Sequence, residues 1–264
     1  MVANEKWFGG GDLGYTIDQS LRFDNGTDEY LSRAVSAGSG QGGTFSWWFK
    51  RSGGFGNNGQ STGNQGATMF KNSAGWSIIN FNTNNELETV THSDIETQTQ
   101  FTTSAWTHAV MNVQAKDTVY VWINGVAQTL DIVSAGNFHW ILQAGNLNIG
   151  GESTYSFNGL LAEVHILDRI NKDQDDFGEF VNSVWKPKDY LTNSGGGSSA
   201  YGTYGAYLKF EDSSNFGNDS SGLNNDYTVY NLGSDHQVTD DTPTTCCVIN
   251  IIILLGERYV GINK

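Results

Sequence analysis

The stretch "GGTFSWWFKRS", residues 42–52, is typical of a central strand of a β-sheet. Successive side chains of a strand point to opposite faces, so Phe45, Trp47 and Phe49 share one face and Trp48 lies on the other. The three aromatic residues suit a hydrophobic core, and Trp47 is expected inside it. Trp48 is then expected to face either a groove or an auxiliary strand.

A second stretch, "AWTHAVMNVQAKDTVYVWINGV" at residues 105–126, predicts two more strands. In both, small or branched apolar residues alternate with larger polar or aromatic ones, which indicates one buried face. Tyr120 and Trp122 share the other face of the second strand. Asn124 and Gly125 follow it, and both residue types tolerate the positive φ that a tight hairpin turn requires.

The composition favours one large all-β domain. The chain has 264 residues with 33 glycines and two prolines, and its short apolar stretches are separated by Asn, Asp, Gly and Ser. One short helix is predicted in "NKDQDDFGEFVNSVW", residues 171–185, where Phe177, Phe180 and Val184 recur at helical spacing behind an acidic first turn. A β-sandwich with one helix at its end and a C-terminal extension is therefore expected.

Composition also divides the chain into five segments. These are a glycine-rich arm (1–20), a sandwich (21–190), a Gly/Ser linker (191–205), further strands (206–232) and an atypical tail (233–264). Two strands alone bury too little surface to fold, so 206–232 is expected to complete the sandwich rather than to begin a truncated second module. The tail contains the apolar run "CCVINIIILL", which is expected to be paired or buried.

The charge excludes some partners. With 28 acidic and 14 basic residues the formal charge is −14, which disfavours binding to nucleic acid and to anionic membranes. The start of the chain, "MVANEKWFGGG", lacks the basic and apolar segments of a signal peptide, so synthesis in a cytoplasm is expected. The two cysteines, Cys246 and Cys247, are adjacent and predict no disulfide framework.

Four stretches, taken in order, resemble the concanavalin A-like, laminin G-type lectin/glucanase family. They are "SLRFDNGTDEYLSR" (20–33), "TFSWWFKRS" (44–52), "AWTHAVMNVQAKDTVYVWINGV" (105–126) and "FNGLLAEVHILDR" (157–169). The resemblance covers residues 20–170 and is specific as a set. It implies a jelly-roll β-sandwich.

The following part of the chain resembles tail or fibre-associated virion proteins of bacteriophages. The resemblance rests on "DFGEFVNSVWKPKDY" (176–190), "YGAYLKFEDSSNFGNDSSGLNNDYTV" (204–229) and "QVTDDTPTT" (237–245). It implies a protein made in the cytoplasm of the bacterial host and carried on the virion. The implied partners are other virion proteins, further copies of the chain and a glycan of the host surface, and a purely structural virion role is the alternative.

A glycan site is predicted from aromatic and polar residues outside the core. Aromatic rings stack on the apolar faces of sugars, whereas Asn and His bind hydroxyl groups. The candidates are Trp48, Trp122, Tyr120, Asn124, Trp106 and His108. The alternative for each tryptophan is a second hydrophobic layer beneath a loop.

Calcium is the one cofactor that the sequence suggests. The candidate ligands lie in Asx-rich loops and are Asp24, Asp28, Asp212, Asp219 and Asp226. Their spacing does not match an EF-hand, and Asx turns that bond their own backbone are the alternative.

No catalytic residue is predicted. The glucanases that the chain resembles carry a Glu-x-Asp-x-x-Glu strand, and this sequence has none. A polysaccharide hydrolase remains a further alternative, with Glu86, Glu88 or Glu163 as its acids. Glu163 lies in an apolar strand, where alternation predicts that Leu161 and His165 share its face.

Overall fold

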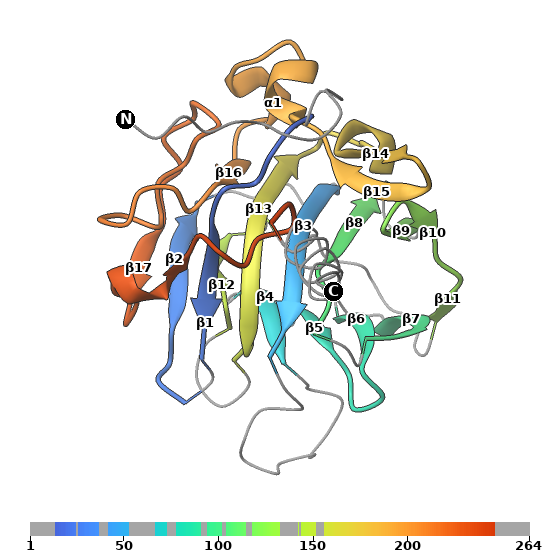
Figure 1. The fold of residues 1–264 in the computed structure, drawn as a ribbon, viewed down its shortest axis with the longest axis horizontal. Helices are drawn as coiled ribbons and strands as arrows, with labels where there is room; N and C mark the ends of the chain where they lie inside the picture. The colour runs from blue at the N-terminus through green and yellow to red at the C-terminus, as the bar shows by residue number, and fades with distance from the viewer. Residues whose placement is uncertain are drawn as a thin grey trace, which may run out of the picture.

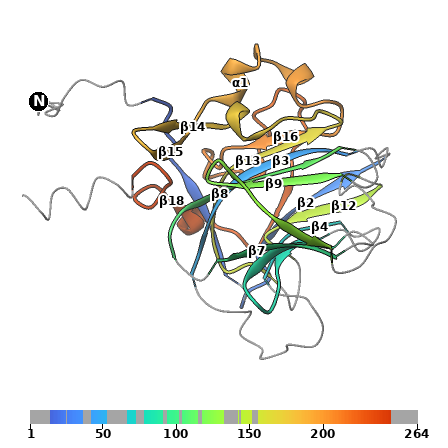
Figure 2. The same cartoon turned by 90° about the vertical axis from the view of Figure 1, so that its right-hand side faces the viewer.

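The structure of the protein, a computed structural model, contains two β-sheets that face each other across a hydrophobic core (Figures 1 and 2). It describes residues 14–24, 26–36, 42–52, 67–72, 78–90, 94–101, 104–114, 118–132, 142, 144–151 and 156–245. Residues 1–13 of the predicted arm and 246–264 of the predicted tail, with the apolar run and both cysteines, lie outside the described residues. No helix in the described part is long and apolar enough to cross a membrane.

The first sheet, called the β3 sheet below, has the order β10-β9-β8-β3-β13-β1-β18, and β16 also pairs with β13. Its strands are β1 (Ser20–Phe23), β3 (Gly43–Arg51), β8 (Thr107–Val113), β9 (Val119–Ile123), β10 (Val126–Ala127), β13 (Gly159–Asp168), β16 (Ala206–Leu208) and β18 (Gln237–Val238). All its pairs are antiparallel.

The second sheet, called the β12 sheet, has the order β11-β7-β6-β5-β4-β12-β2-β17. Its strands are β2 (Tyr30–Val35), β4 (Thr68–Asn72), β5 (Ile78–Phe81), β6 (Glu86–Val90), β7 (Asp94–Gln100), β11 (Leu130–Ile132), β12 (Gly145–Ile149) and β17 (Thr228–Tyr230). The non-sequential order of both sheets is that of a jelly roll, so the predicted all-β class is confirmed.

The core lies between the two sheets and is rich in aromatic residues. Phe45, Trp47 and Phe49 of β3 are fully buried in it, as the alternation predicts. Phe45 and Trp47 make edge contacts with Phe70 of β4, with ring centroids 5.3 and 5.2 Å apart. These contacts join the two sheets directly.

A β-bulge in β13 changes which side chains face the core. The register between β13 and β3 shifts between Ala162 and His165, and Glu163 adopts a φ of 48°. Leu161 faces the core before the bulge, and Val164 faces it afterwards. The prediction that Leu161, Glu163 and His165 share one face was therefore wrong, because the extra residue of the bulge reverses the alternation.

The helix predicted at residues 171–185 is a β-hairpin instead. A 3₁₀ turn, Gln174–Asp176, precedes β14 (Gly178–Val181), and β15 (Val184–Pro187) pairs with β14. Asn182 and Ser183 both have positive φ, as a two-residue hairpin turn requires. The only α-helix in the described part, α1 (Tyr190–Asn193), follows the hairpin.

Residues 191–205 are part of the folded domain, contrary to their prediction as a linker. Gly195, Gly196 and Gly197 all have positive φ and turn the chain between α1 and the 3₁₀ turn Ser198–Ala200. Tyr201 is then completely buried, and its carbonyl accepts a hydrogen bond from Asp168 N at 2.9 Å. The segment packs on the outer face of the β3 sheet as a third layer (Figure 2).

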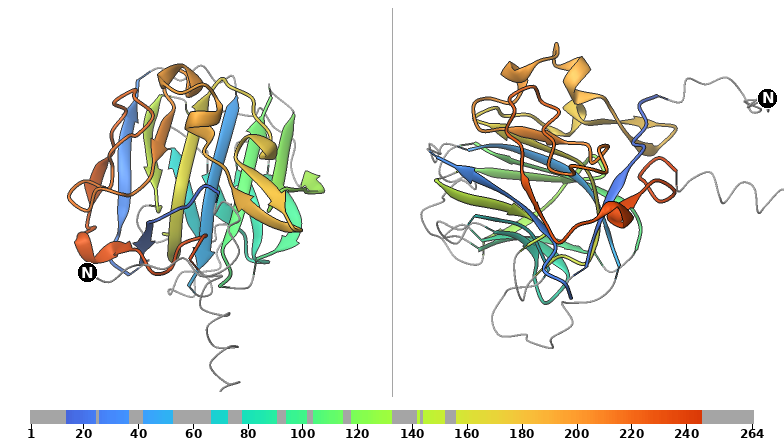
Figure 3. Two further views of the ribbon diagram at one scale, coloured as in Figure 1. Left: turned by 45° about the horizontal axis from the view of Figure 1, so that its top comes forward. Right: turned by 90° about the vertical axis from the view of Figure 1, so that its left-hand side faces the viewer.

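The strands after residue 205 add to both sheets. β16 pairs with β13, and β17 pairs with β2, so the segment 206–232 runs from the β3 sheet to the edge of the β12 sheet (Figure 3). Buried Asp219 organises the connection between them, as described below. The segment is therefore an integral part of this sandwich.

Candidate functional site

The outer face of the β3 sheet is covered over much of its area. Trp48 is only 5% exposed and stacks on His108, with ring centroids 4.8 Å apart. Trp185 of β15 lies beside His108, at 6.0 Å between centroids, and also packs against Gly125. Trp48 thus faces an auxiliary strand, and neither Trp48 nor His108 offers a ring to a ligand.

The hydrogen bonds of His108 fix its protonation. Trp185 Nε1 can only donate, so His108 Nδ1 accepts its hydrogen bond at 3.0 Å. The ring proton is then on Nε2, which donates to Ser46 Oγ at 2.9 Å. Burial, and to a smaller extent the nearby His165, lowers the pKa of His108 to about 3. His108 therefore has no free ring nitrogen with which it could act as a general base and activate Ser46.

A second buried polar cluster surrounds Glu163. Glu163 Oε2 accepts hydrogen bonds from Tyr207 at 2.6 Å and from Tyr15 at 3.0 Å, and lies 3.5 Å from His165 Nε2. His165 Nδ1 is paired with Tyr201 at 3.0 Å. Burial and the charge of Glu163 raise the pKa of Tyr207, which keeps its hydroxyl a donor. Through Oε2, Glu163 thus joins β13 to Tyr207 of β16 and to Tyr15 of the N-terminal segment.

The crevice between these two clusters is closed to ligands. It is lined by Ser46, Trp48, His108, Glu163, His165, Phe177, Pro187 and Lys188, and it is too narrow to admit a water molecule. An auxiliary strand or a second hydrophobic layer over Trp48 was among the predicted alternatives, but its residues could not be named, because Tyr15, Trp185 and Tyr207 come from three distant parts of the chain.

Two of the predicted glycan residues remain at the surface. Tyr120 and Trp122 project side by side from the outer face of β9, with ring centroids 5.9 Å apart and planes 26° apart. Tyr120 is 44% exposed, and Trp122 is partly buried against the third layer. We call this pair the β9 platform. Exposed Tyr120 and partly exposed Trp122 are aromatic rings of the kind that stacks on a sugar.

The other two predicted glycan residues have structural contacts. Trp106 Nε1 donates to Asp241 Oδ1 at 2.9 Å, and Lys50 Nζ forms an ion pair with Asp241 Oδ2 at 2.6 Å. Asn124 occupies the hairpin turn at a φ of 47°, and its Oδ1 accepts from His108 N at 2.8 Å. Trp106 therefore anchors the C-terminal segment, and Asn124 anchors the turn after β9.

The predicted calcium ligands do not converge. In the described part of the chain no three acidic or histidine side chains are grouped so that they could hold a metal ion. Asp219 instead accepts from Tyr207 N, Ser221 N, Ser221 Oγ and Asn225 N at 2.8 to 2.9 Å. Asp226 accepts from Asp219 N, and Asp212 accepts from Ser214 in an Asx turn. These residues fit backbone organisation and do not fit a calcium site.

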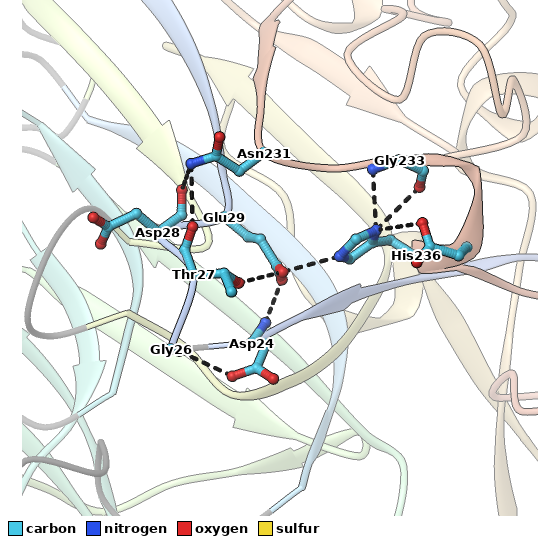
Figure 4. Close-up of polar contacts among 9 residues, drawn as sticks. Asp24, Gly26, Thr27, Asp28, Glu29, Asn231, Gly233 and His236 are labelled. Carbon is cyan, nitrogen blue, oxygen red and sulfur yellow. Dashed lines mark hydrogen bonds and ion pairs between the residues drawn. The ribbon is translucent and has the colours of Figure 1, made fainter.

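Near the turn between β1 and β2, the acid with most partners is Glu29 (Figure 4). Buried Glu29 accepts hydrogen bonds from Asp24 N and Thr27 Oγ1, and lies 2.9 Å from His236 Nε2. Asp24 accepts only from Gly26 N among the described residues. His236, in the 3₁₀ turn Ser234–His236, thereby ties the C-terminal segment to this turn.

The contact between Glu29 and His236 predicts a pH effect. Burial alone would lower the pKa of His236, but the hydrogen bond and charge of Glu29, together with the Gly233 backbone and the charge of Asp235, outweigh it and raise the pKa above 6.5. The stabilisation of the folded state by this contact is therefore complete below pH 6.5 and is lost as the pH rises through the raised pKa of His236. We expect His236→Gln to reduce the free energy of unfolding more at pH 5.5 than at pH 8.5, measured by urea denaturation. Equal losses at both values would contradict the charged contact.

The acids of the hydrolase alternative lie on different sheets. Glu88 is buried on β6, where its Oε2 accepts from Asn80 Nδ2 at 2.9 Å and it lies directly across from Glu96. Glu86 accepts from Asn82 Nδ2 at 2.8 Å. Glu163 lies on the β3 sheet, so it does not join them.

Comparisons with known proteins find solved structures of partial similarity. No curated protein sequence matches the chain. One similar solved structure is a SAP-like pentraxin from Limulus polyphemus, with 14% identity, a TM-score of 0.39, and coverage of 59% of this chain and 76% of that chain. A putative carbohydrate binding protein from Bacteroides ovatus has 16% identity, a TM-score of 0.43, and coverage of 61% of this chain and 46% of that chain. Domain 4 of an extracellular arabinanase from Geobacillus stearothermophilus has 20% identity, a TM-score of 0.39, and coverage of 54% of this chain and 67% of that chain.

One family profile, described as the concanavalin A-like lectin/glucanases superfamily, matches residues 24–175. The match covers more than half of the 264 residues and includes every strand from β2 to β13. The chain belongs to the concanavalin A-like lectin/glucanase superfamily.

Proposed function

We propose that this protein is a non-catalytic carbohydrate-binding module and that the β9 platform is its sugar-binding surface. The observation that carries the proposal is the stacked, outward-facing pair of Tyr120 and Trp122 on a sandwich of the lectin/glucanase superfamily. A sugar ring buries its apolar face on such rings while its hydroxyl groups stay in water or bond to polar neighbours.

The proposal assigns no chemical step to the module. Its support is the state of the reactive side chains: the ring proton of His108 points at Ser46, and Glu163 is held by two tyrosines in a crevice closed to water. A hydrolase would need two carboxylates facing one sugar. Among the described strand pairs Glu96 lies opposite both Glu88 and Asp131. Glu88 is completely buried, and both carboxylate oxygens of Asp131 accept from Gln98 Nε2, at 3.0 and 3.2 Å.

The module is carried on a bacteriophage virion, at the tail or a fibre, where it contacts glycans of the host surface and other virion proteins. This part of the proposal rests on the resemblance of residues 176–190, 204–229 and 237–245 to virion proteins. In this proposal the protein is made in the host cytoplasm and assembles as a homo-oligomer on the virion. Its detection by mass spectrometry in purified virions is expected, and its absence from them would overturn this part.

A glycan array probed with the purified protein tests the binding function. We expect binding to at least one oligosaccharide, unchanged by Ca²⁺ because the predicted ligands are engaged by the backbone. We also expect no release of reducing ends from the oligosaccharide that binds. Absence of binding would favour a purely structural virion protein, and release of reducing ends would favour a hydrolase.

A further inference from the structure

A second exposed aromatic stack lies on the other sheet. Tyr30 of β2 and Tyr230 of β17 are directly opposite in register, with ring centroids 4.5 Å apart and planes only 10° apart. Tyr230 is 41% exposed. One face of the Tyr230 ring is covered by Tyr30, so a third ring can add only on the other face.

The free side of this stack adjoins the edge of the β12 sheet. β17 is the last strand of that sheet, and β2 is its single strand neighbour among the described residues. An edge strand presents backbone N–H and C=O groups that have no partner in the sheet. Thr228, two residues before Tyr230, is exposed on the same face and is paired with Ser32. Hydroxyl-binding groups therefore lie beside the ring.

Asn231 and Asp28 extend the polar surroundings of Tyr230. Asn231 Nδ2 donates to Thr27 O at 3.1 Å and to Asp28 O at 3.0 Å, which fixes the amide. Its Oδ1 is directed away from both carbonyls (Figure 4). Within the described part of the chain, neither this oxygen nor the exposed Asp28 carboxylate accepts a hydrogen bond from protein.

We propose that Tyr230, with Asn231, Asp28 and Thr228 around it, is a second carbohydrate site that takes one neutral pyranose residue of a glycan chain. The sugar stacks on the open face of Tyr230, and its hydroxyl groups donate to Asn231 Oδ1 and Asp28. The sugar is expected to be neutral, because Asp24, Asp28 and Asp235 are all exposed at this corner and repel the carboxylates of sialic and uronic acids.

This site is distinct from the β9 platform, because Tyr120 and Trp122 belong to the β3 sheet and Tyr230 to the β12 sheet. The inference extends the proposed function from one site to two. A purely structural role for the Tyr30–Tyr230 pair would be to stabilise the three-residue strand β17 by cross-strand stacking. The test must therefore separate loss of a ring from loss of the strand.

The experiment measures binding to neutral pentasaccharides of glucose, mannose, galactose and N-acetylglucosamine, with a uronic acid pentasaccharide as the charged probe. Affinities by isothermal titration calorimetry are compared for wild type, Tyr230→Leu, Tyr230→Phe and Trp122→Ala. We expect Tyr230→Leu to weaken binding of one neutral oligosaccharide about tenfold at this site, because an aromatic stack is lost. Tyr230→Phe should keep the affinity within about twofold.

The variants distinguish this inference from the proposed function. A binding event that is lost in Tyr230→Leu but kept in Trp122→Ala and Tyr230→Phe supports the second site. Binding that is lost only in Trp122→Ala supports the β9 platform and overturns the second site. The second site is also overturned if none of the neutral probes binds, or if Tyr230→Phe is as damaging as Tyr230→Leu while thermal unfolding of both variants matches wild type.

Discussion

Replacement of Asp219 by alanine is expected to lower the free energy of unfolding by about 3 to 5 kcal/mol, because several hydrogen bonds to a buried carboxylate are lost together. Asp219 is only 8% exposed and accepts from three backbone N–H groups and one hydroxyl. Alanine leaves these donors without their acceptor in a buried turn. A loss of this size is a large fraction of the stability of a typical domain.

Urea denaturation of Asp219→Ala and of a matched control, Asp212→Ala, measures this effect. Asp212 also accepts from a nearby backbone N–H and hydroxyl in the same segment, but it is exposed. Its replacement should lower the free energy of unfolding far less than Asp219→Ala does, because water can replace the lost acceptor at an exposed site. Equal losses in the two variants would contradict the organising role of Asp219. A rise in wild-type stability on adding Ca²⁺ that disappears in Asp219→Ala would show a metal site instead.

Acidification is expected to destabilise the protein through His108. Its pKa is about 3 in the folded state, against 6.5 for an unperturbed histidine. Between these values the unfolded chain binds a proton that the folded protein does not, so stability falls as the pH falls below 6.5. At about 1.4 kcal/mol per pH unit, the loss on going from pH 6.5 to pH 5 is about 2 kcal/mol.

The contribution of His108 is isolated by comparing wild type with His108→Gln. Glutamine does not titrate, so the stability of the variant should fall less steeply between pH 6.5 and pH 5. His236 and the carboxylates are present in both proteins, and their effects cancel in the difference. Parallel stability curves for the two proteins would contradict the buried, neutral state of His108.

The central strands could be predicted from the sequence because their faces differ in character. Phe45, Trp47 and Phe49 alternate with smaller or polar residues, and a strand of this pattern has only one way to bury its aromatic face. The hairpin turn at Asn124-Gly125 was predicted for a similar reason, since few residues tolerate its φ values.

The parts that could not be predicted depend on tertiary contacts. In residues 171–185 the spacing of Phe177, Phe180 and Val184 mimics a helix, but the pairing of β14 with β15 and the packing of Trp185 on His108 favour a hairpin. The bulge at Glu163 has no glycine to signal it. The local pattern around His108 carries no information about Trp185, which packs on it from 77 residues away in the chain.

The candidate site was therefore predicted only in part. Residue type alone could not separate Trp122, which is only partly buried, from Trp48, which is covered by Trp185 and by the N-terminal segment around Ile17. Tyr230 and Asn231 lacked any motif, because their partners Tyr30 and Asp28 are about 200 residues earlier. Strand pairing between distant segments creates the Tyr30–Tyr230 stack, whereas Tyr120 and Trp122 lie two residues apart on β9.

The most direct test of the carbohydrate-binding function is calorimetric titration of the best array ligand into wild type, Trp122→Ala and Phe180→Ala. Phe180 is a matched control, because it is an exposed aromatic residue on the β14–β15 hairpin outside the β9 platform. We expect Trp122→Ala to weaken binding about tenfold or more, and Phe180→Ala to leave it unchanged. Unchanged affinity in Trp122→Ala, with its fold verified by circular dichroism, would contradict the β9 platform as the sugar-binding surface.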